Sequence, residues 1–154
     1  MKDKIYPNPV ITFVIQYKGK YILLHRGKNE KNYADLWAFP GGKVELGETA
    51  IETIVREAQE EVGLTLKKKI AFLDTYAFGS SVGLAFLVEA TSDKVTLSDD
   101  FQAYSWVSSL RDLKKYPCVP GIYNHLKYAL AVRKNNMFMQ TRDANLLPKN
   151  YINK

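Results

Sequence analysis

Residues 42–64 read GKVELGETAIETIVREAQEEVGL, and this stretch organises the rest of the chain. A glycine-containing loop leads into a segment with helical periodicity. Thr49 and Glu52 match a capping box, in which each side chain bonds the other residue's backbone N–H group, so the helix is expected to start here. Gly63 suits the position just beyond a helix C-terminus. The stretch therefore predicts a loop followed by one helix, with Glu52 in a structural role.

One side of the predicted helix is rich in carboxylates. With a rotation of about 100° per residue and Glu57 set at 0°, Glu61 falls at about 40° and Glu60 at about −60°. An apolar stripe beside this acidic face is expected to pack against the core. The members of the stripe are Ile51, Ile54, Val55, Ala58 and Val62.

This acidic face carries two energetic penalties. Three carboxylates within one turn repel one another, since like charges four residues apart cost roughly a few tenths of a kcal/mol. They also lie toward the helix C-terminus, where the macrodipole disfavours anions. The pattern therefore predicts a bound cation, and oxygen ligands favour Mg²⁺, with Mn²⁺ as a substitute, over zinc.

At these residues the chain resembles the Nudix box, G-x5-E-x7-R-E-U-x-E-E-x-G-U, where U is usually aliphatic. All seven fixed positions match: they are Gly42, Glu48, Arg56, Glu57, Glu60, Glu61 and Gly63. Ala58 and Leu64 stand at the two U positions, and residues 37–42, WAFPGG, resemble the segment that precedes the box. Seven fixed positions at fixed spacing make a specific pattern, although it covers only a small part of the chain.

The resemblance implies a fold, an activity and roles for the box residues. The fold would be an α/β/α sandwich with a mixed sheet between helices. The activity would be Mg²⁺-dependent hydrolysis of a diphosphate bond in a nucleoside diphosphate linked to another group. Glu57, Glu60 and Glu61 would hold the metal, and Glu57 would also help to deprotonate the attacking water. Arg56 would orient a carboxylate, either Glu57 or Glu48, and the Gly41 carbonyl would add an oxygen to the metal ligands.

A further metal-binding carboxylate is expected in a loop beyond the box. Asp100 lies six residues before Trp106, in a segment that resembles the family's E-x5-W-V pattern. This offset makes Asp100 the preferred loop ligand. Asp99 and Glu89 remain alternatives.

Four residues are candidates for substrate binding. Arg26, at the end of a predicted strand, and Lys43, within the box loop, are expected near phosphate, although Arg26 is equally well explained as a solvated surface residue. Trp37 and Phe78 could stack on a base, as could Tyr76. Aromatic residues at such positions are more often part of the core, so both interpretations stay open.

The remaining sequence predicts a mixed α/β domain. A hairpin is expected from strands at Val10–Tyr17 and Tyr21–His25, and the segment Trp37–Pro40 leads to a turn at Gly41–Gly42, where glycine permits positive φ. A second hairpin joins Ile70–Phe78 to Leu84–Ala90 through a turn at 79–83. The C-terminal part is expected to hold a strand at Gln102–Val107, a short helix capped by Ser108 or Ser109 and ending before Pro117, and an amphipathic helix over Gly121–Lys134.

The composition suits one soluble domain covering residues 1–154, with residues 135–154 as a docked or flexible tail. The formal net charge is +6, which would favour phosphorylated ligands but equally fits an ordinary basic surface. A single cysteine, Cys118, excludes an internal disulfide and suits a reducing cytoplasm. The charged, proline-containing N-terminus predicts neither a signal peptide nor a membrane span.

Sequence marks of several Nudix subgroups are absent. The proline of the ADP-ribose group and the tyrosine of the diadenosine polyphosphate group do not occur at their expected places after the box, and the coenzyme A signature is also missing. The preferred substrate is therefore a (deoxy)nucleoside triphosphate, including oxidised forms, as in MutT-like members. The alternatives are an ADP-ribose or sugar-nucleotide pyrophosphatase, an RNA 5′-pyrophosphohydrolase and a non-catalytic nucleotide sensor. A homodimer is left open.

Overall fold

The computed structural model describes residues 7–140. Its strands are β1 (Val10–Tyr17), β2 (Lys20–Arg26), β3 (Trp37–Ala38), β4 (Gly41–Lys43), β5 (Leu66–Phe78), β6 (Ser81–Ala90), β7 (Phe101–Val107) and β8 (Met139–Gln140). The helices are α1 (Ala50–Val62), the short 3-10 helix η1 (Leu110–Lys115) and α2 (Ile122–Asn135). Of the predicted tail, residues 135–140 belong to α2 and β8 with their connection, and residues 141–154 lie outside the described part.

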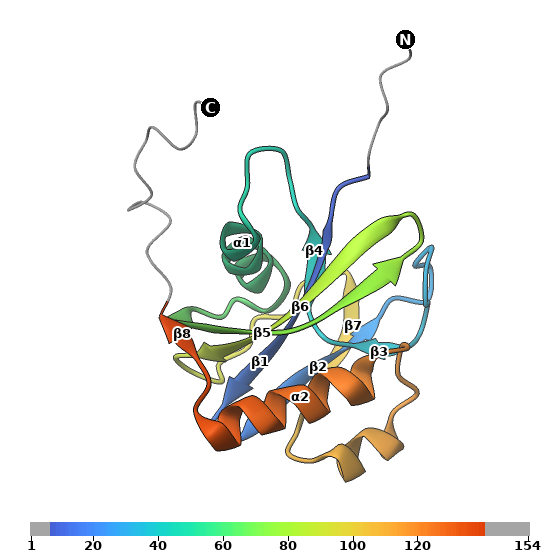
Figure 1. Cartoon of the computed structure of the whole chain (residues 1–154). Helices are drawn as coiled ribbons and strands as arrows, with labels where there is room; N and C mark the ends of the chain where they lie inside the picture. Colours follow the sequence, from blue (N-terminus) through green and yellow to red (C-terminus); the bar gives the residue numbers. More distant parts are fainter. Residues whose placement is uncertain (1–6, 141–154) are drawn as a thin grey trace.

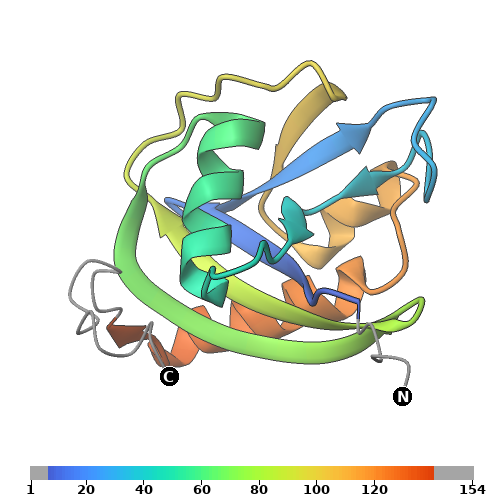
Figure 2. The ribbon, with the colours of Figure 1, turned by 90° about the horizontal axis from the view of Figure 1, so that it is seen from above.

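The strands form one mixed sheet in the order β3-β2-β1-β6-β5-β8, with β4 paired to β1 and β7 paired to β2. β1 runs parallel to β6, while the other pairs are antiparallel. In Figures 1 and 2 α1 and α2 lie on opposite sides of this sheet. This arrangement confirms the predicted α/β/α sandwich with a mixed central sheet.

Alternation along β1 builds the two halves of the core. Ile11, Phe13 and Ile15 pack in one buried cluster with Ile54 and other residues of α1. Val14 points the other way and packs in a second cluster with residues of β2 and α2. Because successive side chains of a strand face opposite sides of the sheet, β1 contributes to both layers.

The hairpin of β5 and β6 is longer than predicted, and its ladder has register shifts between Leu66 and Ile70 and between Phe72 and Asp74. Phe78 pairs with Ser81, so residues 81–83 belong to the ladder and the connection is the pair Gly79 and Ser80. β5 also starts at Leu66 rather than at Ile70. The predicted five-residue turn was wrong because the small residues after Gly79 can continue the strand.

The predicted turn at Gly41–Gly42 is strand β4, and neither glycine has positive φ. Glycine is needed there for close packing instead. A Cβ on Gly41 would lie 2.4 Å from the Ile11 carbonyl oxygen, and one on Gly42 would lie 2.1 Å from Glu57 Oε1. The absence of side chains therefore lets β4 lie against both β1 and α1.

α1 begins and ends as predicted. The Thr49–Glu52 capping box is present in both directions, and Gly63 adopts a left-handed conformation with φ 65°. The apolar stripe differs from the prediction, since Val55 is 50% exposed while Thr53 is buried. The helix is thus rotated so that part of its acidic side, and not Val55, faces the sheet.

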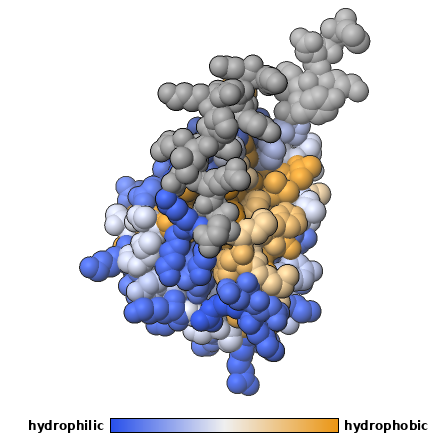
Figure 3. Space-filling view, turned by 60° about the vertical axis from the view of Figure 1, so that its left-hand side comes forward, coloured by the Kyte–Doolittle hydropathy of each residue, from blue (hydrophilic) through white to orange (hydrophobic). Residues whose placement is uncertain are grey.

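The surface carries several exposed apolar side chains, among them Val55, Phe72 and Val82. Figure 3 shows apolar residues gathered on one face of the molecule. Patches of this kind can mark interaction sites, so the homodimer stays an open prediction. No helix within residues 7–140 is both long enough and apolar enough to cross a membrane.

Candidate active site

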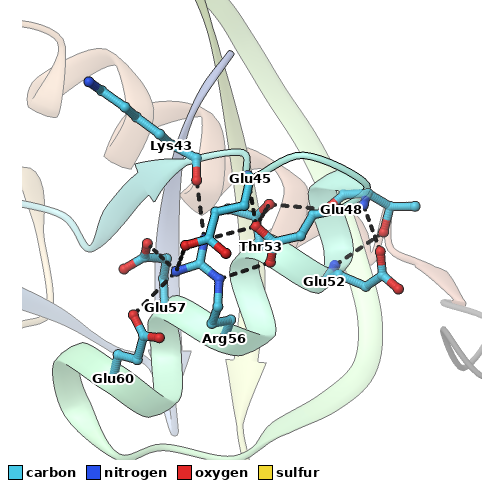
Figure 4. Close-up of polar contacts among 9 residues, drawn as sticks. Lys43, Glu45, Glu48, Glu52, Thr53, Arg56, Glu57 and Glu60 are labelled. Atoms are coloured by element: carbon cyan, nitrogen blue, oxygen red, sulfur yellow. Dashed lines mark hydrogen bonds and ion pairs between the residues drawn. The ribbon is translucent and has the colours of Figure 1, made fainter. Parts of the chain in front are cut away.

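Arg56 is the centre of the polar network on α1 (Figure 4). Its Nε and Nη2 atoms donate to the two carboxylate oxygens of Glu48 at 2.8 and 2.9 Å. Nη1 donates to Glu57 at 2.7 Å and to Glu60 at 3.2 Å, while Nη2 also reaches the Lys43 carbonyl oxygen at 3.2 Å. The prediction that Arg56 orients Glu57 or Glu48 is consistent with this geometry, in which it contacts both.

These contacts change the acidity of the groups involved. The Arg56 guanidinium lowers the pKa of Glu48 to about 2 by hydrogen bonding. In return, the bonds to Glu48 and Glu57 raise the pKa of Arg56 above its usual value. Glu48 is therefore ionised at neutral pH and holds Arg56 over the loop before the helix.

Glu61 lies on the same helix but outside the Arg56 network. Its Oε2 atom accepts a hydrogen bond from the Gly41 N–H group at 3.1 Å. Burial raises the pKa of Glu61 to about 9, and the negative charge of Glu57 adds to the effect. Burial also raises the pKa of Glu57, against the opposing influence of Arg56.

The carboxylates suit a hard cation in chemical type. Within residues 7–140 no three His, Cys, Asp or Glu side chains are already gathered into a metal-binding group. Arg56 engages both Glu57 and Glu60, whereas Glu61 turns toward β4. Even so, Glu61 and Glu57 are neighbouring carboxylates with raised pKa values. A divalent cation between them would stabilise their ionised forms. The donor set therefore fits Mg²⁺ or Mn²⁺, with a rearrangement around Arg56.

A cleft of about 520 Å³ opens beside these residues. Most of its lining comes from β1, β4, β5, the loop between β2 and β3, and residues 119–125 at the start of α2. Single residues of β2, β3, α1 and β7 also line it. Of the predicted site residues, the cleft brings together Arg26, Gly41, Lys43, Glu61 and Phe78. Glu57, Glu60, Trp37 and Asp100 are not among its lining residues.

Arg26 lies between the acidic helix and the loop that follows β2. Its Nη2 atom donates to the Asn32 carbonyl oxygen at 3.0 Å and to Glu30 Oε2 at 3.3 Å. Its Nε atom is buried and has no hydrogen-bond partner among residues 7–140. The positive charge also lies near enough to Glu61 to oppose the rise in that residue's pKa. Arg26 thus lines the cleft while its guanidinium holds the loop that follows β2.

Two of the aromatic candidates have structural partners. Trp37 stacks on His25 with ring centroids 4.8 Å apart and contacts Tyr116 edge-on at 4.7 Å, outside the cleft. Tyr76 does line the cleft, where its hydroxyl bonds that of Thr12. A Cβ on Gly83 would lie 2.3 Å from the Tyr76 ring, so glycine lets this ring lie across β6. The packing of Trp37 favours its core interpretation.

The loop before β7 is tied to the end of α1. The Thr96 and Ser98 N–H groups donate to the carbonyl oxygens of Val62 and Glu61, both at 2.9 Å. Asp100 follows in this loop and accepts a hydrogen bond from the Ser98 hydroxyl at 3.3 Å. The loop therefore brings Asp100 toward the C-terminal end of the acidic helix, although its carboxylate is exposed.

Glu89 lies elsewhere and is not a suitable loop ligand. It forms ion pairs with Lys67 and Lys69 on β5. These three residues line a separate depression, together with Gln16 at the far end of β1. The pairing with two lysines lowers the pKa of Glu89 against the effect of its burial.

The cleft contains polar and aromatic residues that sequence reasoning missed. Asp74 Oδ2 lies 3.5 Å from His125 Nε2, and burial lowers the pKa of His125. Asn124 and Tyr33 complete this part of the lining. The sequence did offer one indication of this wall of the cleft. Residues 74, 76 and 78 alternate along a predicted strand, so their side chains are expected on the same face of the sheet. Nothing in the sequence placed α2 or the β2–β3 loop beside that face.

A family model described as the NUDIX domain matches residues 6–123 of the chain. The nucleoside triphosphatase NudI of Enterobacter sp. is 32% identical over 113 residues, which cover 64% of this chain and 80% of that protein. The 8-oxo-dGTP diphosphatase of Buchnera aphidicola is 32% identical over 125 residues, covering 81% and 93%. The ADP-ribose pyrophosphatase of Methanocaldococcus jannaschii is 31% identical over 107 residues, covering 64% and 62%.

Solved structures agree with these matches. A structure from a study of MutT from Aliivibrio salmonicida and Vibrio cholerae superposes with a TM-score of 0.66 at 25% identity, covering 80% of this chain and 97% of that one. A NUDIX hydrolase from Nitrosomonas europaea superposes with a TM-score of 0.72 at 18% identity, covering 86% and 75%. The second likeness supports the fold alone.

Proposed function

Since this chain belongs to the Nudix hydrolase family, we propose that it hydrolyses a phosphoanhydride bond of (deoxy)nucleoside triphosphates, including oxidised ones, with Mg²⁺ as cofactor. Relatives named as a nucleoside triphosphatase and an 8-oxo-dGTP diphosphatase support this substrate class. The relative named as an ADP-ribose pyrophosphatase keeps that nucleotide as the second candidate.

The observation that carries the proposal is the position of Glu61. It lies on the acidic face of α1, bonds the Gly41 N–H group and lines the cleft. The same cleft is lined by Arg26 and Lys43, whose cationic side chains suit phosphate groups. One carboxylate of the acidic face and two basic side chains therefore line the same cavity, whose volume suits a nucleotide.

The acidic residues are the proposed metal ligands. Glu57, Glu60 and Glu61, with the Gly41 carbonyl and the loop residue Asp100, would hold the cation. When bound, Mg²⁺ supplies charge neutralisation of the phosphates and acidifies water.

Glu57 is the proposed proton acceptor, and its raised pKa suits that role. Arg56 fixes the direction of the Glu57 carboxylate through their 2.7 Å hydrogen bond. Phosphate contacts would come from Arg26, which lines the cleft, and from Lys43, whose side chain extends away from the Arg56 network in Figure 4.

A hydrolysis screen tests the proposal. The panel contains common and oxidised (d)NTPs, ADP-ribose, sugar nucleotides, dinucleoside polyphosphates and an RNA with a 5′-triphosphate, each with Mg²⁺ and with EDTA. We expect the fastest turnover on a nucleoside triphosphate and none in EDTA. Fastest turnover on ADP-ribose or on RNA would replace the substrate assignment, and nucleotide binding without turnover would indicate a sensor.

Variants test the residue roles within the same screen. Glu57→Gln and Glu61→Gln should each lower kcat by orders of magnitude. Glu52→Gln is a matched control on the same helix, because glutamine also serves in a capping box, and it should keep normal turnover. Near-normal turnover of both active-site variants would refute the metal assignment.

A further inference from the structure

The loop between β2 and β3, residues 27–35, forms one wall of the cleft. Asn32 and Tyr33 line the cavity from this loop, and Arg26 lines it from the end of β2, just before the loop. The Arg26 side chain also contacts the loop, since its Nη2 atom donates to the Asn32 carbonyl oxygen at 3.0 Å. The shape of the loop therefore determines where the Arg26 guanidinium lies in the cleft.

Gln102 of β7 ties the two ends of this loop together. Its Nε2 atom donates to the Arg26 carbonyl oxygen at 2.7 Å and to Asp35 Oδ1 at 2.8 Å. Both partners are acceptors, so a reversed amide group would place its own oxygen against two others. One side chain thus connects the start of the loop to its end.

An irregularity of the sheet directs Gln102 toward the loop. His25 pairs with Ala103 and Arg26 pairs with Phe101, so Gln102 is an extra residue of β7 that has no partner on β2 in this ladder. Such a β-bulge bends the strand and changes the direction of the side chain that it carries. The bulge therefore contributes to the anchoring of the loop.

Asp35 meets the Gln102 amide group in an uncommon backbone conformation. Its φ of 61° lies in the left-handed region, which aspartate and asparagine adopt more readily than other residues with a side chain. The Asp35 N–H group donates to the Gly27 carbonyl oxygen at 3.1 Å, and Oδ1 lies 2.9 Å from His25 Nε2. The hydrogen bond from Gln102 lowers the pKa of Asp35, so a carboxylate accepts these bonds at neutral pH.

We propose that Gln102 and Asp35 are positioning residues for the nucleotide, an inference that rests on the proposed function. Neither residue lines the cleft, so both act through the loop, whose binding-competent shape they favour over other shapes. The apparent dissociation constant of a ligand rises in proportion as the competent shape becomes less populated. Loss of the Gln102–Asp35 hydrogen bond should therefore weaken nucleotide binding, while the bound complex and its chemistry stay the same.

Steady-state kinetics separate this role from a purely structural one. Gln102→Ala and Asp35→Gly each remove two hydrogen bonds, and glycine suits the positive φ of position 35. KM for the nucleoside triphosphate that the screen selects should rise by about 5- to 30-fold at unchanged kcat, the change expected for two hydrogen bonds of ordinary net strength. Asp35→Asn keeps the acceptor oxygen and tolerates the left-handed backbone, so it should retain the wild-type KM.

Gln59→Ala is the matched control for loss of a glutamine side chain. Gln59 Nε2 also donates to two oxygen atoms, the Leu64 carbonyl oxygen at 3.1 Å and Thr65 Oγ1 at 3.3 Å, but Gln59 lies on α1 outside the cleft. This variant should lower the urea midpoint, as Gln102→Ala should, and keep the wild-type KM. An equal rise in KM in both glutamine variants would overturn the positioning role.

Amide hydrogen exchange tests the anchoring of the loop without any turnover. In EDTA, residues 27–36 should exchange faster in Gln102→Ala and Asp35→Gly than in the wild type or in Asp35→Asn, while β1 and β6 exchange alike in all four proteins. Unchanged exchange of the loop would overturn the proposal, even for an enzyme that hydrolyses nucleotides. Faster exchange with an unchanged KM would also overturn it.

Nucleotide binding keeps the proposal testable if the hydrolysis screen finds no substrate. The dissociation constant of dGTP in EDTA, measured by titration calorimetry, then replaces KM in the comparison. Weakening by about 5- to 30-fold in Gln102→Ala and Asp35→Gly would support the positioning role although the proposed hydrolysis had failed. Equal affinity of these variants and the wild type, or no binding of dGTP at all, would overturn it.

Discussion

Replacing Glu61 with glutamine should stabilise the metal-free protein at neutral pH. Burial and the nearby Glu57 charge raise the pKa of Glu61 from 4.5 to about 9. Between these values the folded state binds more protons at this site than the unfolded state does. The free energy of unfolding therefore falls as pH rises through this window, by up to about 1.4 kcal/mol per pH unit.

At pH 7 this cost amounts to at most about 3 kcal/mol, since pH 7 lies some 2.5 units above the unfolded pKa. The Glu61 side chain keeps part of its surface open to the cleft, so solvent screening places the measured value below this limit. Glutamine carries no charge, and its amide oxygen can still accept the Gly41 N–H group. Glu61→Gln should thus gain little at pH 5 and increasingly more at pH 7 and 8.5.

Urea unfolding in EDTA at these three pH values measures the effect. Glu52→Gln serves as the control for loss of one helix carboxylate, and its stability difference from the wild type should not grow with pH. A difference between Glu61→Gln and the wild type that is the same at all three values would refute the reasoning. Saturating Mg²⁺ should restore stability to the wild type but not to the variant.

Three further outcomes are expected. Arg56→Lys keeps the charge but loses the two-pronged bonds to carboxylates, so urea unfolding should show a loss of about 2–3 kcal/mol and steady-state assays a lower kcat. Gly83→Ala should push the Tyr76 ring off β6 and lower the free energy of unfolding by about 1–3 kcal/mol, whereas an unchanged urea midpoint would contradict the close contact. Asp100→Asn should lower kcat less than the α1 variants do. If kcat of this variant matched that of the wild type over the whole pH range, Asp99 would replace Asp100 as the proposed metal ligand of the loop.

The acidic helix was the most predictable part of the molecule. Local patterns define it, because capping residues and the spacing of carboxylates depend only on nearby sequence. The direction in which the helix faces was less predictable. A helical projection gives the angle between Glu61 and Val55 but not which of them meets the sheet, and here Val55 is exposed while Glu61 lies against β4.

The far wall of the cleft could not be derived from the sequence. Asp74 and His125 meet only because β5 and the start of α2 pack together, and no local pattern encodes that contact. Trp37 shows the same limit, since its stacking partner His25 comes from the neighbouring strand. Arg26 was recognised as a candidate, but its hydrogen bond to the Asn32 carbonyl oxygen in the loop between β2 and β3 depends on the folded backbone.

The parallel pairing of β1 with β6 has a consequence for how the chain reaches this structure. β1 can complete its pairing only when β6 is available, and β2, β3, β4, α1 and β5 lie between these two strands in the sequence. Closing such a large loop costs entropy before any contact repays it, so this step should make folding slow compared with a helical bundle. During synthesis, the first hairpin would leave the ribosome with one edge of β1 unpaired. That edge is the part of the chain most exposed to mispairing until residue 90 has emerged.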